Sequence, residues 1–458
     1  MGGGCRATAW VTGALRGGAL PGGALAAAAC RAAVRAAAAL VVVAALSTGG
    51  VGAGASPVAA QSLLVPMDGT QTNHLKAYGL TYWVLGRHET AEWLLNYRAG
   101  SFLLPDAPAV RREAALRGVA VEPVSPADVA RIRATIASSN MESVVLEKAP
   151  RIAVYTPPGS APWDDAVTMA LTYAGIPYDR VWDPEVLNGK LSQYDWLHLH
   201  HEDFTGQYSK FYINYASAGW LQDEVARNQA VAEEFGYPNV PALKKAVANR
   251  IRDYVANGGF LFAMCAGTET IDLALAAAGV DIAASFSDGT PPDPDASSKM
   301  DWSRTFAFEN AQVQTNPAIN AFSDIDGHQV NTPWREPLGA FTLFDFSAKI
   351  DPVPSMLVQD HESVIPDFYG LTTSFRRDRL KPGVIVLAEE EGAPWVKYIH
   401  GNLGKGTWTF LGGHDPEDPE HQIGDPPTNL DLHPHSPGYR LILNNVLFPA
   451  ARKKTLKT

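Results

Sequence analysis

The feature that most limits how this 458-residue chain can fold is an apolar run that turns abruptly into an Ala-rich stretch at Cys265. The run Phe260–Met264 follows a Gly-Gly turn and predicts a buried strand, while residues 271–278 predict a helix that ends at a glycine. A strand that turns directly into a helix holds its corner residue in a strained conformation, and bulky neighbours two positions away would collide. Ala263 and Gly267 occupy those positions. The pattern predicts a nucleophile elbow with cysteine at its apex.

The elbow gives Cys265 a possible chemical role. The N-terminus of the following helix favours the thiolate and lowers the pKa of the thiol. The amide of Ala266 is a candidate oxyanion donor, and Gly267 belongs to the same turn. The alternative is a buried cysteine that only contributes to packing.

Strands alternate with helices from residue 151 onward. This alternation predicts an α/β fold with a doubly wound, mostly parallel sheet. Ligands of such sheets bind outside the carboxyl ends of the strands, where Tyr155, His200 and Cys265 fall. The expected strands are 151–155, 178–182, 196–200, 260–264, 384–387, 396–400 and 407–411, and the expected helices are 163–174, 241–256, 271–278 and 439–447.

The chain divides into four parts by composition and pattern. Residues 1–60 read as a signal peptide, 61–148 as an N-terminal α/β unit, and 149–452 as the main domain with an irregular insertion at about 285–381. In the first part, four arginines precede an 11-residue apolar run at 36–46, and small residues lead to a plausible cleavage site after Ala60. The run is too short to span a bilayer, and no later run approaches that length. We expect a periplasmic or secreted protein without a membrane span.

Removal of the signal changes the charge and the cysteine count. The segment carries four arginines and no acid, so the formal net charge goes from −11 to −15. A chain this acidic is a poor partner for nucleic acid. Cys5 and Cys30 leave with the signal, so Cys265 cannot form an internal disulfide and is a candidate reactive thiol.

A base for the thiol is expected after the hairpin at 396–411. His414 follows a strand and a Gly-Gly pair, with Asp415 one residue and Glu417 three residues later. In this interpretation His414 takes the thiol proton, and one of the two acids fixes the tautomer of its ring. Which acid faces the ring stays open, and a structural histidine in a polar loop is the alternative.

A second cluster of polar residues lies at 198–203. Alternation places His198 and His200 on one face of a strand and His201 on the other, with Glu202 and Asp203 following. These side chains could bind a metal, contact the substrate, or lie beside a backbone donor opposite the elbow. We assign His200, His201 and Glu202 to substrate binding and expect no metal and no cofactor.

Residues 151 to about 450 resemble the class I glutamine amidotransferase-like superfamily. The matching segments are Asn257-Gly258-Gly259 leading to Ala263-Met264-Cys265-Ala266-Gly267, and Phe410-Leu411-Gly412-Gly413-His414-Asp415-Pro416-Glu417. The resemblance implies a flavodoxin-like fold in which Cys265, His414 and Glu417 act together. The superfamily motif usually reads His-Pro-Glu, and Asp415 is an extra residue here. The Gly-Gly-His-Asp segment also resembles the trehalose-utilisation branch, whose members need not use a cysteine.

The N-terminal segments Leu64-Val65-Pro66-Met67-Asp68 and His74-Leu75-Lys76-Ala77-Tyr78-Gly79 resemble exported bacterial proteins labelled asparagine synthetase B. The chain lacks the N-terminal cysteine and the Ser-Gly-Gly-x-Asp-Ser loop of true asparagine synthetases. The label therefore does not predict ATP-dependent synthesis.

Together these observations predict an exported thiol-dependent hydrolase that cleaves an amide or related acyl bond. The expected partner is a small molecule, or an amide or glycan of the cell envelope. The alternative is a ligand-binding or sugar-processing relative that uses His200, His201 and His414 as contacts. In that case the tryptophans Trp163, Trp182, Trp196 and Trp408 are available to stack on a sugar. The oligomeric state does not follow from the sequence.

Overall fold

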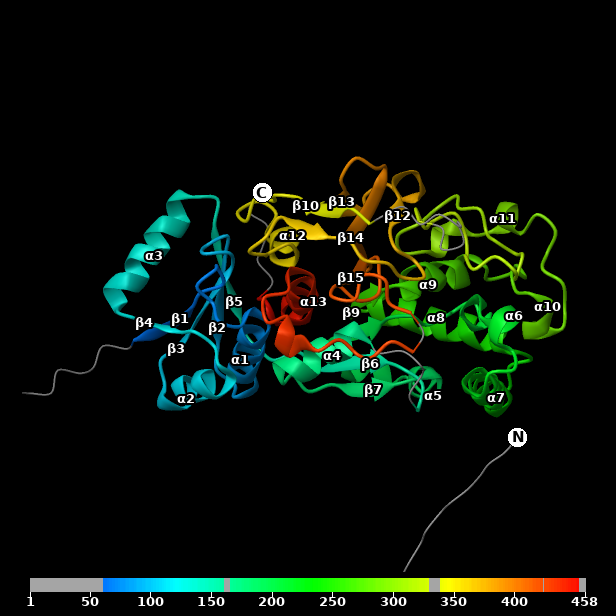
Figure 1. Cartoon of the computed structure of the whole chain (residues 1–458), viewed down its shortest axis with the longest axis horizontal. Coiled ribbons are helices and arrows are strands. Elements are labelled where there is room, and N and C mark those ends of the chain that lie inside the picture. The colour runs from blue at the N-terminus through cyan, green and yellow to red at the C-terminus, as the bar shows by residue number, and fades with distance from the viewer. Residues whose placement is uncertain (1–60, 160–164, 329–337, 423, 453–458) are drawn as a thin grey trace, which may run out of the picture. The chain divides into compact units, whose positions relative to one another are not determined.

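A ten-stranded sheet forms the centre of the main domain, and helices cover both faces of its parallel half (Figure 1). The computed structural model describes residues 61–159, 165–328, 338–422 and 424–452. The expected signal peptide, residues 1–60, lies outside these ranges, as does Trp163. No helix of the described residues is long and apolar enough to cross a membrane.

The parallel half of this sheet contains five neighbouring strands, in the order β15-β9-β8-β6-β7. Side chains of β9 alternate between two cores: Phe260 and Phe262 enter the core that includes α4 and α13, and Leu261 enters the core of α8 and α9. Strands buried on both faces are apolar throughout, which is why this run was recognisable in the sequence. The strands are β6 (Ile152–Tyr155), β7 (Asp179–Val181), β8 (Trp196–Leu199), β9 (Phe260–Met264) and β15 (Gly406–Leu411).

The other half of the sheet is antiparallel, so the expectation of a mostly parallel sheet is wrong. The order continues from β15 through β14, β13 and β10 to β11, and β12 pairs with β14. Three of these strands come from the region expected to be an irregular insertion. They escape sequence analysis because they have only two to four residues and lie between loops. The strands are β10 (Ala340–Leu343), β11 (Val364–Pro366), β12 (Phe375–Arg376), β13 (Ile385–Glu390) and β14 (Trp395–Leu403).

Three helices of the main domain, α4, α8 and α13, begin at side-chain caps. Asn239 caps α8 by accepting from the amide of Ala242, and Ser436 caps α13 by accepting from Tyr439. Helix α9 begins at Ala266, directly after the elbow, and not at residue 271 as expected. The helices are α4 (Ala166–Ala174), α5 (Asp183–Leu187), α6 (Tyr212–Tyr215), α7 (Gly219–Glu234), α8 (Val240–Ala256), α9 (Ala266–Ala276), α10 (Ser285–Asp288), α11 (Ala296–Lys299), α12 (Pro352–Leu357) and α13 (Pro437–Leu447). Short 3-10 turns include Lys190–Gln193, Tyr208–Lys210, Trp302–Arg304, Arg377–Arg379, Leu430–Leu432 and Phe448–Ala450.

The segment 61–148 folds around its own five-stranded antiparallel sheet of order β4-β1-β3-β2-β5. Ser125 caps its third helix in a capping box with Asp128. The strands are β1 (Ser62–Val65), β2 (Ala91–Leu95), β3 (Ser101–Pro105), β4 (Glu122–Val124) and β5 (Glu142–Leu146). The helices are α1 (His74–Gly86), α2 (Pro108–Arg117) and α3 (Pro126–Ser138).

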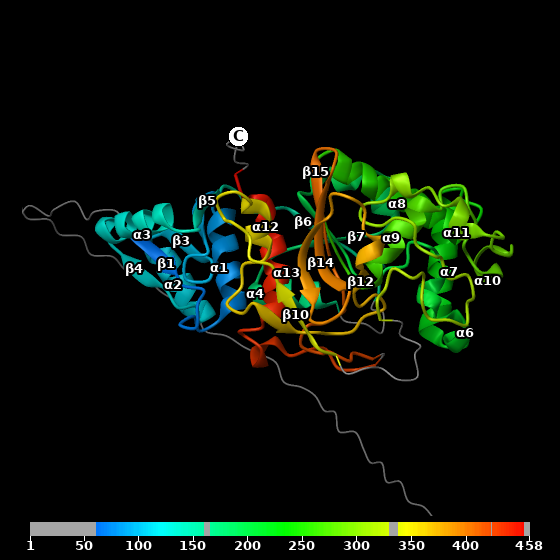
Figure 2. The same ribbon diagram turned by 90° about the horizontal axis from the view of Figure 1, so that it is seen from above.

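The two sheets share one hydrophobic core. Helix α1 packs against α4 and α13, as both views show (Figures 1 and 2). At this junction the fully buried Arg440 of α13 donates to the carbonyl of Met67, to the carbonyl of Ala99 and to the hydroxyl of Tyr78. The single charged side chain of Arg440, on α13 of the main domain, thus satisfies acceptors in segment 61–148.

Candidate functional site

Cys265 lies at the strained corner that the sequence predicts. Its backbone has φ 49° and ψ −139° between β9 and α9, a region that residues with a side chain rarely adopt. Such strain costs on the order of 1–3 kcal/mol and persists where the surrounding structure fixes it, most often at functional sites.

The sulfur of Cys265 does not face an open crevice. The residue is 1 % exposed, and the Sγ atom accepts a hydrogen bond of 3.2 Å from the amide of Leu371. Burial raises the pKa of the Cys265 thiol, although amides of Leu371, Ala266 and Thr372 oppose the shift. A side chain at Gly370 would lie 3.0 Å from the sulfur and 2.9 Å from Gly413, so this loop fills the space beside the sulfur.

His414 also lies at a strand end, but its partners differ from those expected. Its ring bonds to His200, with 2.9 Å between His414 Nδ1 and His200 Nε2. Within the described part of the chain, no hydrogen bond joins the ring to the sulfur of Cys265. The side chain is 5 % exposed, and its Nε2 atom has no partner there either. This ring nitrogen is therefore available to a water molecule, an ion or a ligand.

The two acids predicted to orient His414 lie elsewhere. Glu417 pairs with His433, at 2.7 Å between Oε2 and Nδ1. Asp415 is fully buried and accepts from the amide of Glu417 and from the hydroxyl of Thr428. The expected role of these acids is therefore corrected.

The carboxylate that supports the histidines is Asp165. Its Oδ1 atom lies 3.2 Å from His200 Nδ1 and 3.5 Å from His198 Nε2. The same atom caps α4 by accepting from the amides of Val167 and Thr168. Burial raises the pKa of Asp165, but the two histidines beside it hold that pKa well below its usual range. Asp165 therefore favours a proton on His200 Nδ1, which leaves a lone pair on His200 Nε2.

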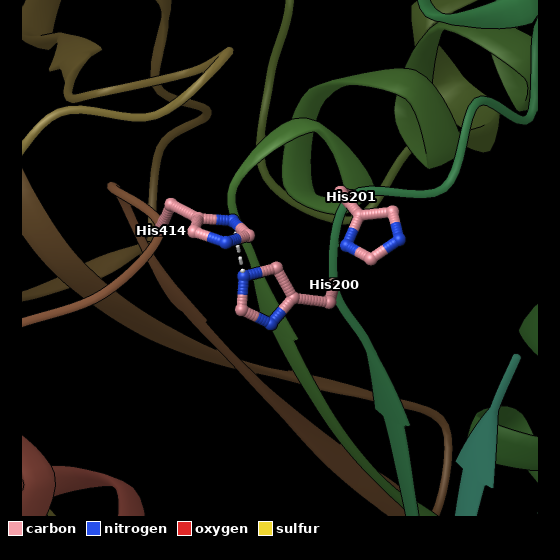
Figure 3. Close-up of side chains that lie close together, drawn as sticks. All are labelled: His200, His201 and His414. Carbon is pink, nitrogen blue, oxygen red and sulfur yellow. Dashed lines mark hydrogen bonds between the residues drawn. The ribbon is translucent and has the colours of Figure 1, made fainter. Parts of the chain in front are cut away.

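Three histidines meet at the carboxyl ends of β8 and β15, which lie on either side of β9 (Figure 3). His200, His201 and His414 each offer a ring nitrogen, and these three atoms lie within 4.8 Å of one another. The ring of His201 is centred 5.4 Å from that of His200 and 6.0 Å from that of His414. Burial lowers the pKa of His201 to about 3 and that of His414 well below its ordinary value. Neutral imidazoles are the form that binds metal ions.

The elbow positions this cluster through the backbone. The amide of Gly267 donates to the carbonyl of His200 at 2.6 Å, so it cannot serve as the expected oxyanion donor. The amide of Ala266 bonds to the sulfur of Cys265 itself. A Cβ atom at Gly267 would lie 2.5 Å from the same carbonyl. The small residue after the cysteine therefore lets the end of β8 approach α9.

A cavity of about 140 Å³ lies beside the cluster, and His201 and Glu202 belong to its lining. Burial raises the pKa of Glu202 to about 8 and that of Glu224, across the cavity on α7, to about 7. Neither Cys265 nor His414 belongs to the lining. Glu202 thus lies next to the histidines and beside this cavity, and its role in substrate binding stays a prediction.

Sequence analysis found the histidines but missed Asp165 and the link between the two clusters. His200, His201 and His414 were candidates at two separate strand ends, which the β8-β9-β15 order brings together. Asp165 had a usable signal, because an Asp before the first apolar turn of a helix is a typical cap.

No family model and no curated protein matches this chain. Among solved structures, the chain is similar to the cytoplasmic proteins STM3548 from Salmonella typhimurium and STM1381 from Salmonella typhimurium LT2. Their identities are 11 % and 12 % and their TM-scores 0.33 and 0.34, over 66 % of this chain and 100 % of each of theirs.

A third similarity is to the exo-β-1,4-mannosidase Op5Man5 from Opitutaceae bacterium strain TAV5. The identity is 12 % and the TM-score 0.26, over 57 % of this chain and 31 % of that one. TM-scores this low carry no conclusion about function. What the molecule itself defines is an α/β protein with a buried histidine cluster at the carboxyl ends of parallel strands.

Proposed function

We propose that the protein is a metal-dependent hydrolase of amide or related acyl bonds, with a divalent ion of the zinc type bound by His200, His201 and His414. The observation that carries this proposal is the convergence of three ring nitrogens within 4.8 Å at the carboxyl ends of parallel strands. Two nitrogens on one tetrahedral Zn²⁺ lie about 3.3 Å apart. The 2.9 Å between His200 Nε2 and His414 Nδ1 needs only a small adjustment.

Asp165 supplies the support that such a site requires. Ligating histidines commonly donate their second ring N–H to a carboxylate, which fixes the tautomer and the ring orientation. His200 has this arrangement, with Nδ1 towards Asp165 and Nε2 towards His414. His414 would release its Nδ1 proton to bind the ion through that atom, or bind through its unpartnered Nε2.

Three protein ligands leave one coordination position for water. A bound divalent ion lowers the pKa of that water towards 7 and makes hydroxide available at neutral pH. Such an ion would supply a hydroxide as nucleophile for the acyl carbon, and an acid of the chain would protonate the leaving nitrogen or oxygen. Glu202 directly follows His201 and lines the neighbouring cavity, and its raised pKa suits proton donation to a leaving group. Among possible substrates, a small-molecule or cell-envelope amide is our proposal.

Metal analysis of the purified chain tests the proposal. We expect about one equivalent of bound Zn²⁺ per chain, and at least tenfold weaker binding in His200→Ala, His201→Ala and His414→Ala. The matched control is His88→Asn, because His88 is exposed and asparagine accepts its left-handed conformation. Failure of the intact chain to retain added Zn²⁺ on dialysis would sink the proposal.

A thiol-dependent hydrolase is the second candidate, and a specific observation favours it. Cys265 combines a strained backbone with a sulfur that faces the amides of Leu371, Ala266 and Thr372. Amide donors around a sulfur stabilise a thiolate, and strain of this kind is typical of nucleophiles. In this alternative, His414 is the nearby base, and loop 370–372 has to move before a substrate reaches the sulfur.

Hydrolysis of p-nitrophenyl acetate separates the two candidates. A metal centre predicts that a chelator abolishes turnover and that Cys265→Ser retains it. A thiol centre predicts the opposite, together with inactivation by iodoacetamide near neutral pH.

A further inference from the structure

The cavity beside His201 has chemical features that the hydrolase proposal does not use. Its lining comes from the segment after β8, from α7, and from the starts of α5 and α8. Two aromatic side chains, Trp182 and Trp220, belong to the lining. Cavities of this size hold small organic molecules.

A rigid turn forms one wall of the cavity. Tyr208, Ser209 and Lys210 adopt left-handed conformations in succession, with φ of 55°, 53° and 61°. Asp203 fixes the turn by accepting from the amides of Thr205, Gln207 and Ser209. Each left-handed residue with a side chain costs about 1–2 kcal/mol, so the wall is held in a conformation that the chain does not prefer.

The charged groups of the lining are unbalanced. Lys244 is already bound to the carboxylate of Asp183 and to the hydroxyl of Tyr155. Arg227 remains to offset the carboxyls of Asp203, Asp223, Glu202 and Glu224. Within the described residues, no side-chain hydrogen bond or ion pair engages the carboxyl groups of Glu202 and Glu224. The lining therefore has more carboxyl groups than cationic groups, and burial raises the pKa of Glu202 to about 8 and that of Glu224 to about 7.

Among the described residues, three buried polar atoms of the lining lack partners. One is a donor, the Nε atom of Arg227, and the other two can accept. These two are the hydroxyl of Tyr208 and the Oδ1 atom of Asn228, in side chains that are 3 % and 5 % exposed. An unsatisfied buried polar atom costs about 1–3 kcal/mol, so a ligand that bonds to both gains affinity. Oδ1 only accepts, and the hydroxyl can accept, so the complementary ligand is rich in N–H donors.

We propose that this cavity binds a small primary ammonium compound. The ammonium donates its three N–H groups to the carboxyl group of Glu224, the Oδ1 atom of Asn228 and the hydroxyl of Tyr208, and it favours the ionised form of Glu224. Trp182 and Trp220 supply apolar surface in the lining for the alkyl chain of such a cation. This binding does not require the metal ion, and it goes beyond the proposed hydrolase.

Calorimetric titration with propylamine, in the presence of EDTA, tests the inference. The chelator removes any ion to which the amine could bind, so the outcome is independent of the histidine cluster. We expect propylamine to bind at least tenfold more tightly than 1-propanol, which has the same shape without the charge. Glucose serves as the saccharide probe and is expected not to bind.

Variants locate the binding. Glu224→Gln keeps the shape and removes the charge, and it should weaken propylamine binding at least tenfold. Tyr208→Phe removes only the unpartnered hydroxyl and should weaken binding severalfold without unfolding the turn. Glu233→Gln, an exposed change on the same helix, is the control. The inference is overturned if 1-propanol or glucose binds as tightly as the amine, if no probe binds, or if Glu224→Gln changes nothing.

Discussion

Asp165 performs two tasks with one carboxylate, because it caps α4 and supports His200. Substitution by asparagine separates the tasks, since asparagine also caps helices but cannot stabilise a ligating imidazole through charge. We expect Asp165→Asn to weaken Zn²⁺ binding 10–100-fold with little loss of stability. Zn²⁺ titration and thermal melting measure the two effects.

The matched control is Asp128→Asn in the capping box of α3, which should leave Zn²⁺ binding unchanged. Equal Zn²⁺ affinity in Asp165→Asn and the wild type would contradict the supporting role of this carboxylate.

At the scale of single residues, the sequence identifies candidate site residues better than it identifies the side chains to which they bond. Cys265 and His414 were identified from small neighbours and strand ends, and Cys265 has the predicted strain. The partners of His414 could not be predicted from the sequence. Asp415 and Glu417 are close to His414 in the sequence and were therefore chosen, whereas Asp165 is distant. Whether an acid three residues away reaches a ring depends on loop geometry, which spacing alone does not define.

At the scale of elements, the contact between β8 and α9 depends on Gly267. An alanine there would place its Cβ 2.5 Å from the carbonyl of His200 and 3.2 Å from Leu199, so the strand end must move. We expect Gly267→Ala to lower the free energy of unfolding by about 1–3 kcal/mol and to weaken Zn²⁺ binding. Urea denaturation and Zn²⁺ titration check both effects.

Gly279→Ala is the control for this change, because no atom lies within 4 Å of the added methyl group. A stability loss as large as that of Gly267→Ala would show that glycine replacement itself, and not the contact with β8, is responsible.

Helix α9 also carries a buried acid, Glu269, whose protonation couples stability to pH. Burial raises its pKa to about 8, although hydroxyls of Ser323 and Thr372 bond to it. A carboxyl with a raised folded pKa contributes full stability below its unfolded pKa, near 4.5, and loses it as pH rises through 8. Glu269→Gln removes this dependence, so its stability relative to the wild type should increase with pH.

The expected change is about 1 kcal/mol per pH unit between pH 5 and pH 8, measured by urea denaturation across that range. A constant difference between the two proteins would mean that Glu269 is ionised throughout.

Elements that are long or buried on both faces were predicted within a few residues. The expected strand 260–264 matches β9, and the expected helix 241–256 matches α8 with one more residue at its start. Helix α9 was placed too late, because Gly267 and Thr268 are poor helix formers whose conformation here depends on tertiary contacts. The strands β10, β11 and β12 are too short for an alternating pattern of apolar and polar residues to be recognised.

At the scale of the whole molecule, the two sheets depend on Arg440. Its guanidinium satisfies acceptors of Met67, Ala99 and Tyr78 and lies 4.0 Å from the buried Asp360. Removing one partner of a buried ionic network typically costs about 3–5 kcal/mol. We expect Arg440→Met to lower the free energy of unfolding by that amount in urea denaturation.

Arg452→Met provides the comparison, because Arg452 pairs with Glu147 at the surface and should contribute less than about 1 kcal/mol. Similar losses in both variants would mean that the junction does not depend on Arg440.

The order of the strands was the least predictable property of the fold. The α/β class followed from alternation, because each parallel connection needs a helix. The antiparallel half could not be predicted from the sequence. The residue patterns of β13 and β14 are compatible with either a parallel or an antiparallel sheet. Pairing across more than a hundred residues, as between β9 and β15, has no local signal.

The outermost strands of the large sheet have a consequence for behaviour at high concentration. One edge is β11, three residues that end in Pro366, and the other is β7, which begins with Asp179 and Arg180. Proline lacks an amide hydrogen, and charged side chains disfavour the stacking of one chain's edge on another's. These borders make poor templates for intermolecular strand addition, so crowded solutions of the protein should resist fibril formation.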